Sequence, residues 1–423
     1  MIRTKERVKA MGHLVTGLDI GTTKVTTIIA SIQEDESVDV IGVGQVNSRG
    51  LERGMVVNLE ETVYSIQESI QQAEYIADVK VDRAYVGIAG NHIRGINTSA
   101  VVSVASADNE ITPEDVNRVM QTAQTMDIPP DLEIIHVFPQ GYEVNGVDQV
   151  RNPVGLSGTR LEGEVYIVLA STTAVQNIKR AVSRAGVEVA EIVLQPLASS
   201  LAVLTGDEKE LGVAMLDVGG GTTDIAVFTN GNIRHTAVVG LGGSNVTSDI
   251  AIVLPVPMVE ARRLKHTFGY SLTSLVDEDQ QIMPETGLGG RSAEPVSIQN
   301  LAEIIESRME EIFQFAWREV QRAGLDRVLA GGVVLTGGGA MVKGAPDLAR
   351  KVFGLPVKLG QPHGVGGLVN SVSSPMNATG IGLVLYGANQ ERLRGPSGDD
   401  GGSNEGSSPL GSAFKWMRNF LTG

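Results

Sequence analysis

The sequence predicts an α/β protein built from two related lobes that face each other. Two segments, VTGLDIGTTKVTTIIA (15–30) and VAMLDVGGGTTDIAVF (213–228), share one pattern. Each reads as an apolar strand, an aspartate, a Gly/Thr turn and a second β-branched strand, which is typical of a β-hairpin. A third glycine turn lies in GGVVLTGGGAMVKG (331–344). The occurrence of the hairpin in both halves of the chain indicates two related lobes.

Helical patterns separate these turns. The stretch 58–77 has apolar residues at helical spacing, and Asn58 is a suitable N-cap. A second helix is expected after Thr112, with Pro113 at its first position, and a third ends at Gly186. After Leu241 we expect a mostly helical block, which includes a long amphipathic helix over 296–324.

Composition restricts the class of protein. The 423-residue chain carries a net charge of −15, which argues against nucleic acid as a partner. It contains no cysteine, so we expect neither disulfides nor thiolate metal sites, in keeping with a reducing compartment. The basic start of the chain lacks the long apolar run of a secretory signal, and no stretch reaches the ~20 apolar residues of a spanning helix. Any membrane contact is therefore expected at a surface.

The turns have the chemistry of a phosphate site. Gly/Thr turns present backbone N–H groups and hydroxyls to phosphate oxygens. Asp19 and Asp217, which end the strands that enter the turns, can hold a hydrated Mg²⁺, and Lys24 can neutralise phosphate charge. A single Gly-rich hairpin is more often an ordinary turn, but a matched pair favours nucleotide binding. The candidate nucleotide residues are Gly21, Thr22, Thr23, Lys24, Gly219, Gly220, Gly221, Thr222, Thr223, Gly337, Gly338 and Gly339.

These motifs resemble the actin-like ATPase superfamily, which includes actin, DnaK-type chaperones, sugar kinases, MreB and FtsA. The resemblance covers the chain from about Leu14 to Ala388. It implies the actin-like ATPase fold, with ATP and Mg²⁺ as cofactors. Two connecting helices of that fold are expected at 191–204 and 377–387.

Within the superfamily, the sequences of segments 210–228, 233–251 and 332–344 are similar to those of the FtsA family. The segment from about Gly87 to Val165 lies where that family carries an inserted small α+β subdomain. The resemblance implies a cell-division protein that forms actin-like filaments and tethers FtsZ to the inner face of the cytoplasmic membrane at midcell. It also implies contacts between the inserted subdomain and other division proteins.

The resemblance implies the following division of the chain. The first lobe comprises residues 14–86, 166–206 and 366–394, and the insert comprises 87–165. The second lobe comprises 207–241 and 326–365, and its peripheral subdomain comprises 242–325. The remaining segments are a flexible start (1–13), a linker (395–409) and a terminal helix (410–423).

Two positions depart from the superfamily pattern. Gln195 stands before Pro196, where many of these ATPases carry a glutamate that positions the attacking water; glutamine can orient a water but is a poor base. Lys265 matches the adenosine-side lysine, but Arg262 stands where an acid is usual, and Glu260 lies two positions earlier. We therefore expect nucleotide binding with weak or no ATPase activity.

The C-terminal segment predicts a membrane-surface helix. On a helical wheel of 410–421 the apolar residues fall on one arc and the basic ones opposite, which is typical of an interfacial helix. An amphipathic terminus can instead dock on its own domain, but the Gly/Ser-rich stretch 395–409 reads as a flexible linker, which spans roughly 20 Å and favours an anchor on an anionic membrane. The membrane-facing candidates are Leu410, Phe414, Lys415, Trp416, Met417, Arg418, Phe420 and Leu421.

One partner site follows from the resemblance. FtsZ's C-terminal peptide is expected on the peripheral subdomain, where Arg308 either receives an acid of the peptide or is a solvated helix charge paired with Glu311. His136 has no metal-ligand spacing, and we interpret it as structural.

Two alternative functions use the same fold: a small-molecule kinase and a pilus-assembly scaffold that binds a peptide of a membrane protein.

Overall fold

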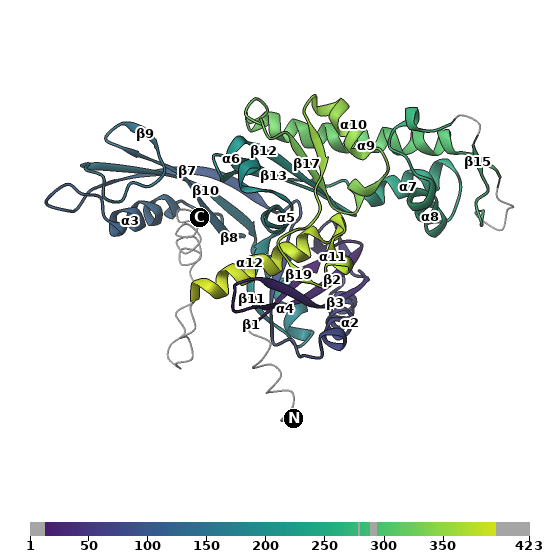
Figure 1. The fold of residues 1–423 in the computed structure, drawn as a ribbon, viewed down its shortest axis with the longest axis horizontal. Helices are drawn as coiled ribbons and strands as arrows, with labels where there is room; N and C mark the ends of the chain where they lie inside the picture. The colour runs from purple at the N-terminus through teal and green to yellow at the C-terminus, as the bar shows by residue number, and fades with distance from the viewer. Residues whose placement is uncertain (1–12, 278–279, 288–293, 395–423) are drawn as a thin grey trace.

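The computed structural model describes residues 13–277, 280–287 and 294–394, and Figure 1 shows their arrangement. The first lobe is built on a six-stranded sheet of order β11-β6-β1-β2-β3-β19. Its first hairpin pairs β1 antiparallel with β2, and β1 runs parallel to β6. The elements of this lobe are β1 (His13–Ile20), β2 (Lys24–Ile32), β3 (Val38–Asn47), β4 (Leu51–Glu52), β5 (Met55–Val56), α2 (Leu59–Ala77), β6 (Arg83–Ile88), α4 (Thr172–Arg184), β11 (Glu188–Leu194), β19 (Gly366–Gly367) and α11 (Val369–Val372).

The second lobe repeats the pairing pattern of the first. In its five-stranded sheet, of order β14-β13-β12-β17-β18, β12 pairs antiparallel with β13 and parallel with β17. This repetition confirms the two related lobes expected from the hairpins. The elements are α6 (Gly206–Leu211), β12 (Val213–Val218), β13 (Thr223–Thr229), β14 (Asn232–Val239), β17 (Val333–Thr336), η3 (Gly339–Met341), α10 (Ala345–Phe353) and β18 (Val357–Leu359).

A mostly helical part follows β14, as expected, and lies on the right in Figure 1. Its long helix begins at Ile298 rather than Val296, because Val296 pairs with Ile282 in a short ladder. The helix buries an apolar stripe that includes Leu301, Ile305 and Ile312. The elements are α7 (Gly243–Val253), α8 (Met258–Phe268), η1 (Thr273–Leu275), β15 (Gln281–Ile282), β16 (Val296–Ser297) and α9 (Ile298–Arg322).

The inserted subdomain projects on the opposite side in Figure 1. It is a four-stranded antiparallel sheet of order β7-β10-β8-β9 with helix α3 packed against it. A capping box between Thr112 and Asp115 begins the helix, and Pro113 stands in its first turn, as predicted. The elements are β7 (Arg94–Ser103), α3 (Pro113–Gln124), β8 (Leu132–Val144), β9 (Val147–Val150) and β10 (Arg160–Ser171).

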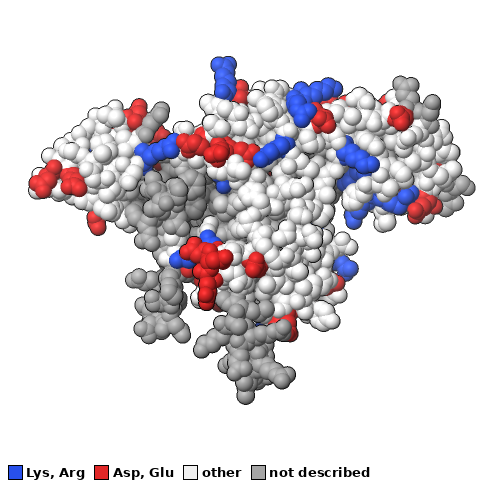
Figure 2. Space-filling model, viewed as in Figure 1, with Lys and Arg blue, Asp and Glu red and all other residues white. Residues whose placement is uncertain are grey.

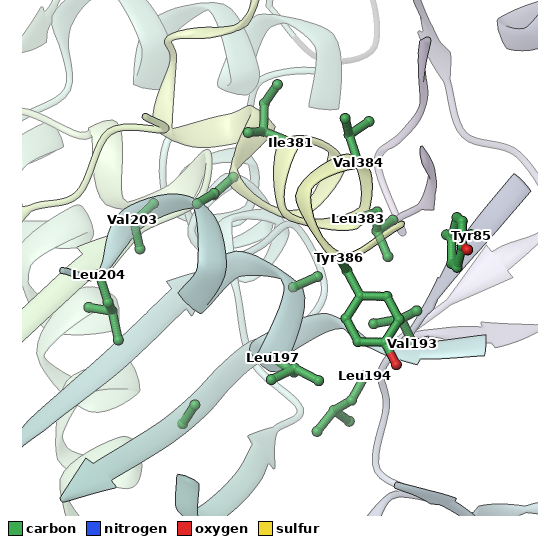
Figure 3. Close-up of a cluster of buried hydrophobic side chains, with 14 of the residues drawn as sticks. Tyr85, Val193, Leu194, Leu197, Val203, Leu204, Ile381, Leu383, Val384 and Tyr386 are labelled. Carbon is green, nitrogen blue, oxygen red and sulfur yellow. The ribbon is translucent and has the colours of Figure 1, made fainter. Parts of the chain in front are cut away.

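Helices α5 (Gln195–Val203) and α12 (Ala378–Arg394), the latter preceded by η4 (Pro375–Asn377), cross between the lobes. The first connecting helix is shorter than the expected 191–204, because residues up to Leu194 pair with β6 as strand β11. Figure 3 shows Leu197 of α5 and Ile381, Leu383 and Val384 of α12 in one buried cluster. A Cβ on Gly382 would lie 1.8 Å from the Ala198 carbonyl oxygen, so only glycine permits this crossing.

None of the helices in the described residues is both long and apolar enough to cross a membrane. On the face shown in Figure 2, acidic and basic side chains are interspersed, and a group of basic side chains lies toward the right, over the part that carries α7 and α8.

The helix crossing gives a stability prediction. Gly382→Ala should lower the free energy of unfolding by about 2 kcal/mol, because the added methyl group meets backbone that cannot move aside. Urea denaturation followed by circular dichroism measures this change. Gly206→Ala is the control, since no atom lies within 4 Å of the Cβ it would add. Equal stability of the two variants would contradict the tight crossing.

Candidate functional site

A cavity of about 340 Å³ lies between the lobes, and nearly all of the predicted nucleotide residues line it. The two Gly/Thr turns meet there. A Cβ on Gly220 would lie 2.3 Å from Thr23 Cγ2, and one on Gly221 would lie 2.8 Å from Thr22 Oγ1. The fold therefore brings together turns that are about 200 residues apart in the chain.

Helix α7 supports the second turn. The backbone N–H groups of Gly243 and Ser244 donate to the carbonyl oxygens of Gly219 and Gly220, at 2.9 and 2.8 Å. Within the part of the chain that the structure describes, the N–H groups of Gly220 and Gly221 have no hydrogen-bond partner. Unpaired N–H groups in a cleft are the donors that a phosphate oxygen requires.

Asp19 and Asp217 lie at the floor of the cavity and are almost fully buried. Gln195 Nε2 donates to Asp19 Oδ1 at 3.2 Å, and the hydroxyls of Ser199 and Thr379 donate to Asp217 Oδ2 at 2.7 and 3.2 Å. Burial raises the pKa of Asp19 to about 6, against the attraction of the Lys24 ammonium, and burial also raises the pKa of Asp217. Hydroxyl donors and an amide thus hold both carboxylates in place.

Asp224 is a site residue that the sequence analysis missed. It lines the cavity next to Asp217, its Oδ1 is buried without a hydrogen-bond partner, and burial with the nearby carboxylates raises its pKa well above the usual range. Thr223 does not line the cavity and instead donates to the Leu241 carbonyl oxygen at 2.9 Å. Thr223 and Asp224 are neighbours at the start of β13, and neighbouring residues of a strand point to opposite faces of the sheet. This alternation could have shown that only one of the two faces the cavity, whereas the Gly/Thr motif by itself could not.

The carboxylate set fits a hydrated magnesium ion. Mg²⁺ prefers oxygen ligands, keeps several waters and shares phosphate oxygens, so it needs few protein ligands. Among residues 13–277, 280–287 and 294–394 there is no group of three or more His, Cys, Asp or Glu side chains with metal-binding geometry. Asp19 and Asp217 would therefore hold the ion largely through water, and the unpaired oxygen of Asp224 could accept from such a water.

Lys24 joins the first turn to η4, the segment just before α12. Its ammonium donates to Asn377 Oδ1 at 2.9 Å and to the carbonyl oxygen of Met376, and burial lowers its pKa. Its charge lies close enough to Asp19 and Asp217 to offset part of the rise that burial causes in the pKa of both carboxyls. Lys24 thus balances part of the negative charge at this end of the cavity.

The other end of the cavity is basic. Lys265 Nζ donates to the Gly243 carbonyl oxygen at 2.8 Å and to Thr247 Oγ1 at 2.9 Å, and burial lowers its pKa to about 8. Arg262 also lines this end. Glu260 does not, because its carboxylate forms two hydrogen bonds with the Arg263 guanidinium, at 2.9 and 2.7 Å. Glu260 therefore does not replace the acid that is usual at the position of Arg262.

The three glycines of the third turn have different roles. Gly337 has a φ of +86°, and a Cβ there would lie 2.3 Å from Asp217 Oδ1. A Cβ on Gly339 would lie 2.5 Å from Val218 Cγ1, whereas one on Gly338 would meet nothing closer than Met376 Cβ at 3.8 Å. Gly337 and Gly339 are thus required by packing, and Gly338 leaves space in the cavity.

Arg308 lies on α9, away from this cavity. Its guanidinium donates to both oxygens of Asp249, at 2.5 and 3.1 Å, and forms an ion pair with Glu311. Arg308 thus pairs with Glu311, as the interpretation of a helix charge expected, and also with Asp249 of α7. The predicted linker and membrane-facing residues 410–421 lie outside the described residues.

The fold and the cleft define a member of the actin-like class of proteins. Two solved structures share the fold: the PilM-PilN type IV pilus biogenesis complex (TM-score 0.65, 16% identity, 88% of this chain and 98% of that chain) and MreB5 of Spiroplasma citri bound to ADP (TM-score 0.55, 14% identity, 90% and 98%). These similarities confirm the predicted fold class.

Sequence comparison gives the family. A family model for cell division protein FtsA matches residues 214–382, and a model for the SHS2 domain inserted in FtsA matches residues 90–169. Cell division protein FtsA of Pseudomonas aeruginosa is 41% identical over 96% of this chain and 98% of its own, and that of Neisseria meningitidis is 42% identical over 95% and 97%. The chain belongs to the FtsA family of cell-division proteins, and the kinase and pilus-scaffold alternatives are not favoured.

Gly338 offers a test of the cavity that spares the fold. If a nucleotide such as ATP occupies the cavity, Gly338→Leu should weaken its binding at least tenfold, because the side chain would fill the open space beside the third turn. Isothermal calorimetry measures the affinity, and thermal melting should stay close to that of the wild type. Undiminished ATP binding by a folded Gly338→Leu protein would contradict the assignment of the cavity.

The raised pKa of Asp19 gives a pH prediction for the metal-free, nucleotide-free chain. Between pH 3.8 and about 6 the folded state binds a proton at Asp19 that the unfolded state has lost. The contribution of Asp19 to the free energy of unfolding therefore falls as pH rises through that window, by on the order of 1 kcal/mol per pH unit. Asp19→Asn should remove this share of the pH dependence and leave the share of Asp217 and Asp224, whose pKa values are also raised. Urea titrations of both proteins at several pH values would measure the difference. Parallel profiles would show that Asp19 has an ordinary pKa.

Proposed function

We propose that the chain binds ATP with Mg²⁺ in the cleft between its lobes. The observation that carries the proposal is the contact of two Gly/Thr turns from opposite lobes above a floor of buried carboxylates. The turns would receive the phosphates through backbone N–H groups, Lys24 would neutralise phosphate charge, and Lys265 with the third glycine turn would lie on the nucleoside side. Two solved MreB5 structures of this fold carry ADP and AMPPNP, which supports the choice of nucleotide.

Hydrolysis should be slow or absent. Gln195 is the candidate for positioning the attacking water, and its side-chain amide donates to Asp19 Oδ1 at 3.2 Å. An amide can orient a water molecule, but it cannot accept the proton that the attacking water must lose. The nucleotide would therefore act mainly as a structural ligand that fixes the relative positions of the lobes.

We further propose that the protein tethers FtsZ to the inner face of the cytoplasmic membrane at the division site. Membership of the FtsA family supports this role. The peptide of FtsZ would bind the peripheral subdomain near Arg308, where it would have to displace Asp249 or Glu311 from the guanidinium. The inserted subdomain would present a separate surface to other division proteins.

The C-terminal residues 410–423 would provide the membrane anchor. Each large apolar side chain contributes at most ~1.5–3 kcal/mol on burial, and each Lys or Arg near an anionic surface adds ~1 kcal/mol. Ordering about a dozen residues costs ~1 kcal/mol or more of backbone entropy for each residue. A single anchor should thus bind weakly, whereas many anchors on one filament would bind tightly, so self-assembly and membrane binding reinforce each other.

Liposome co-sedimentation tests the anchor. With ATP and Mg²⁺, the full chain should pellet with anionic vesicles, and a chain that ends at Ser408 should stay in the supernatant, because it lacks the apolar and basic residues. A full-length variant with Phe414→Gln and Leu421→Gln is the matched control for chain length. If all three proteins pellet equally, or if none does, the anchor hypothesis is wrong.

A further inference from the structure

The inserted subdomain is held to both lobes by buried polar side chains of β8 and β10. On the side of the first lobe, the backbone N–H of Leu194 donates to His136 Nε2 at 3.0 Å. His136 is 5% exposed, and its ring stacks on Phe138 and meets Tyr386 of α12 edge-on. Burial lowers the pKa of His136 to about 4, so the neutral ring remains an acceptor at physiological pH.

The same hydrogen bond lies next to the cleft. Leu194 is the last residue of β11 and the N-cap of α5, and the following residue is Gln195, whose side chain donates to Asp19. Leu194 has no side-chain capping bond to fix the start of the helix. His136 therefore supplies an anchor at the point where α5 enters the cleft.

The other lobe is held from the same sheet. Gln140 Nε2 donates to the Ile233 carbonyl oxygen at 2.7 Å, and the Thr236 N–H donates to the Tyr166 hydroxyl oxygen at 2.8 Å. The ladder of β8 and β10 shifts register at two points, next to His136 and at Gln140. Such irregularities re-aim side chains, and here they flank the residues that reach the two lobes.

Strand β14, which receives Gln140 and Tyr166, pairs with β13, the strand that leaves the second phosphate turn. The insert thus contacts both lobes: His136 contacts the segment that carries Gln195, and Gln140 contacts the sheet that carries Asp217 and Asp224. A rotation of one lobe toward the other cannot leave both sets of hydrogen bonds unchanged, because all of them start from one packed sheet.

We propose that His136 is a positioning residue through which the inserted subdomain and the nucleotide cleft are energetically coupled. Binding in the cleft changes the position of the insert, and a partner that holds the insert changes the affinity of the cleft by the same factor. The coupling rests on the proposed nucleotide binding, and His136 itself touches neither the nucleotide nor the metal.

The first test needs no nucleotide. In the full chain, His136→Phe keeps an aromatic ring but removes the acceptor, so amide hydrogen exchange in the peptide that covers 194–199 should accelerate at least tenfold. His136→Gln restores an acceptor and should recover much of the protection. Val137→Ala is the matched control, because Val137 lies in the insert's own core and does not contact Leu194 through a hydrogen bond. Equal effects of His136→Phe and Val137→Ala would overturn the proposal.

The second test adds ATP and Mg²⁺ to the same proteins. In the wild type, nucleotide should change exchange in β7, β8 and β10; in His136→Phe that response should be lost and the affinity should fall about tenfold, with recovery in His136→Gln. If the wild type binds nucleotide and His136→Phe shows the same affinity and the same response of the insert, the coupling is wrong while the proposed function stands. If the wild type binds no nucleotide at all, both are wrong.

Discussion

The close crossing of helices α5 and α12 is the constraint on which the rest of the structure depends. Gly382 brings the two backbones together at Ala198, and the buried cluster around them joins the core of both lobes. Each helix then sends one hydroxyl, from Ser199 and from Thr379, to the same carboxylate, Asp217. The position of that carboxylate in the second lobe is thus fixed by helices that pack against the first. A change in the crossing would therefore change the site itself.

The second constraint is electrostatic. Three aspartates lie buried at the floor of the cleft, and their pKa values are raised mainly by burial. Buried carboxylates are unfavourable unless cations or donors accompany them. Among the residues that the structure describes, Lys24, two hydroxyls and one amide do so. This incomplete compensation is what a metal–nucleotide complex would relieve, because the ion supplies positive charge and the turns supply donors to the phosphates.

The cleft, the peripheral helices and the insert occupy separate parts of the molecule. The cleft lies between the lobes. In Figure 1, the peripheral helices lie on one side of the lobes and the insert lies on the other. Because the insert reaches both lobes through His136, Gln140 and Tyr166, it is placed to respond to the cleft without lining it. The net charge of −15 is unsuited to an anionic membrane. The proposed anchor would therefore need a linker longer than the Debye length of ~8 Å.

The sequence by itself determined the local features. Strand and helix periodicity, the N-caps at Asn58 and Thr112, and the three glycine turns were each readable, because local propensity and turn chemistry act over a few residues. Only the tertiary structure decided what depends on contacts between distant segments. It placed Asp224 rather than Thr223 in the cavity, ended β11 at Leu194 through pairing with β6, and gave Arg308 a second acidic partner in Asp249. It also decided that His136, which the sequence suggested was merely structural, accepts the N–H at the start of α5. No local pattern encodes such contacts, because they depend on how the packed lobes bring together residues that are far apart in the chain.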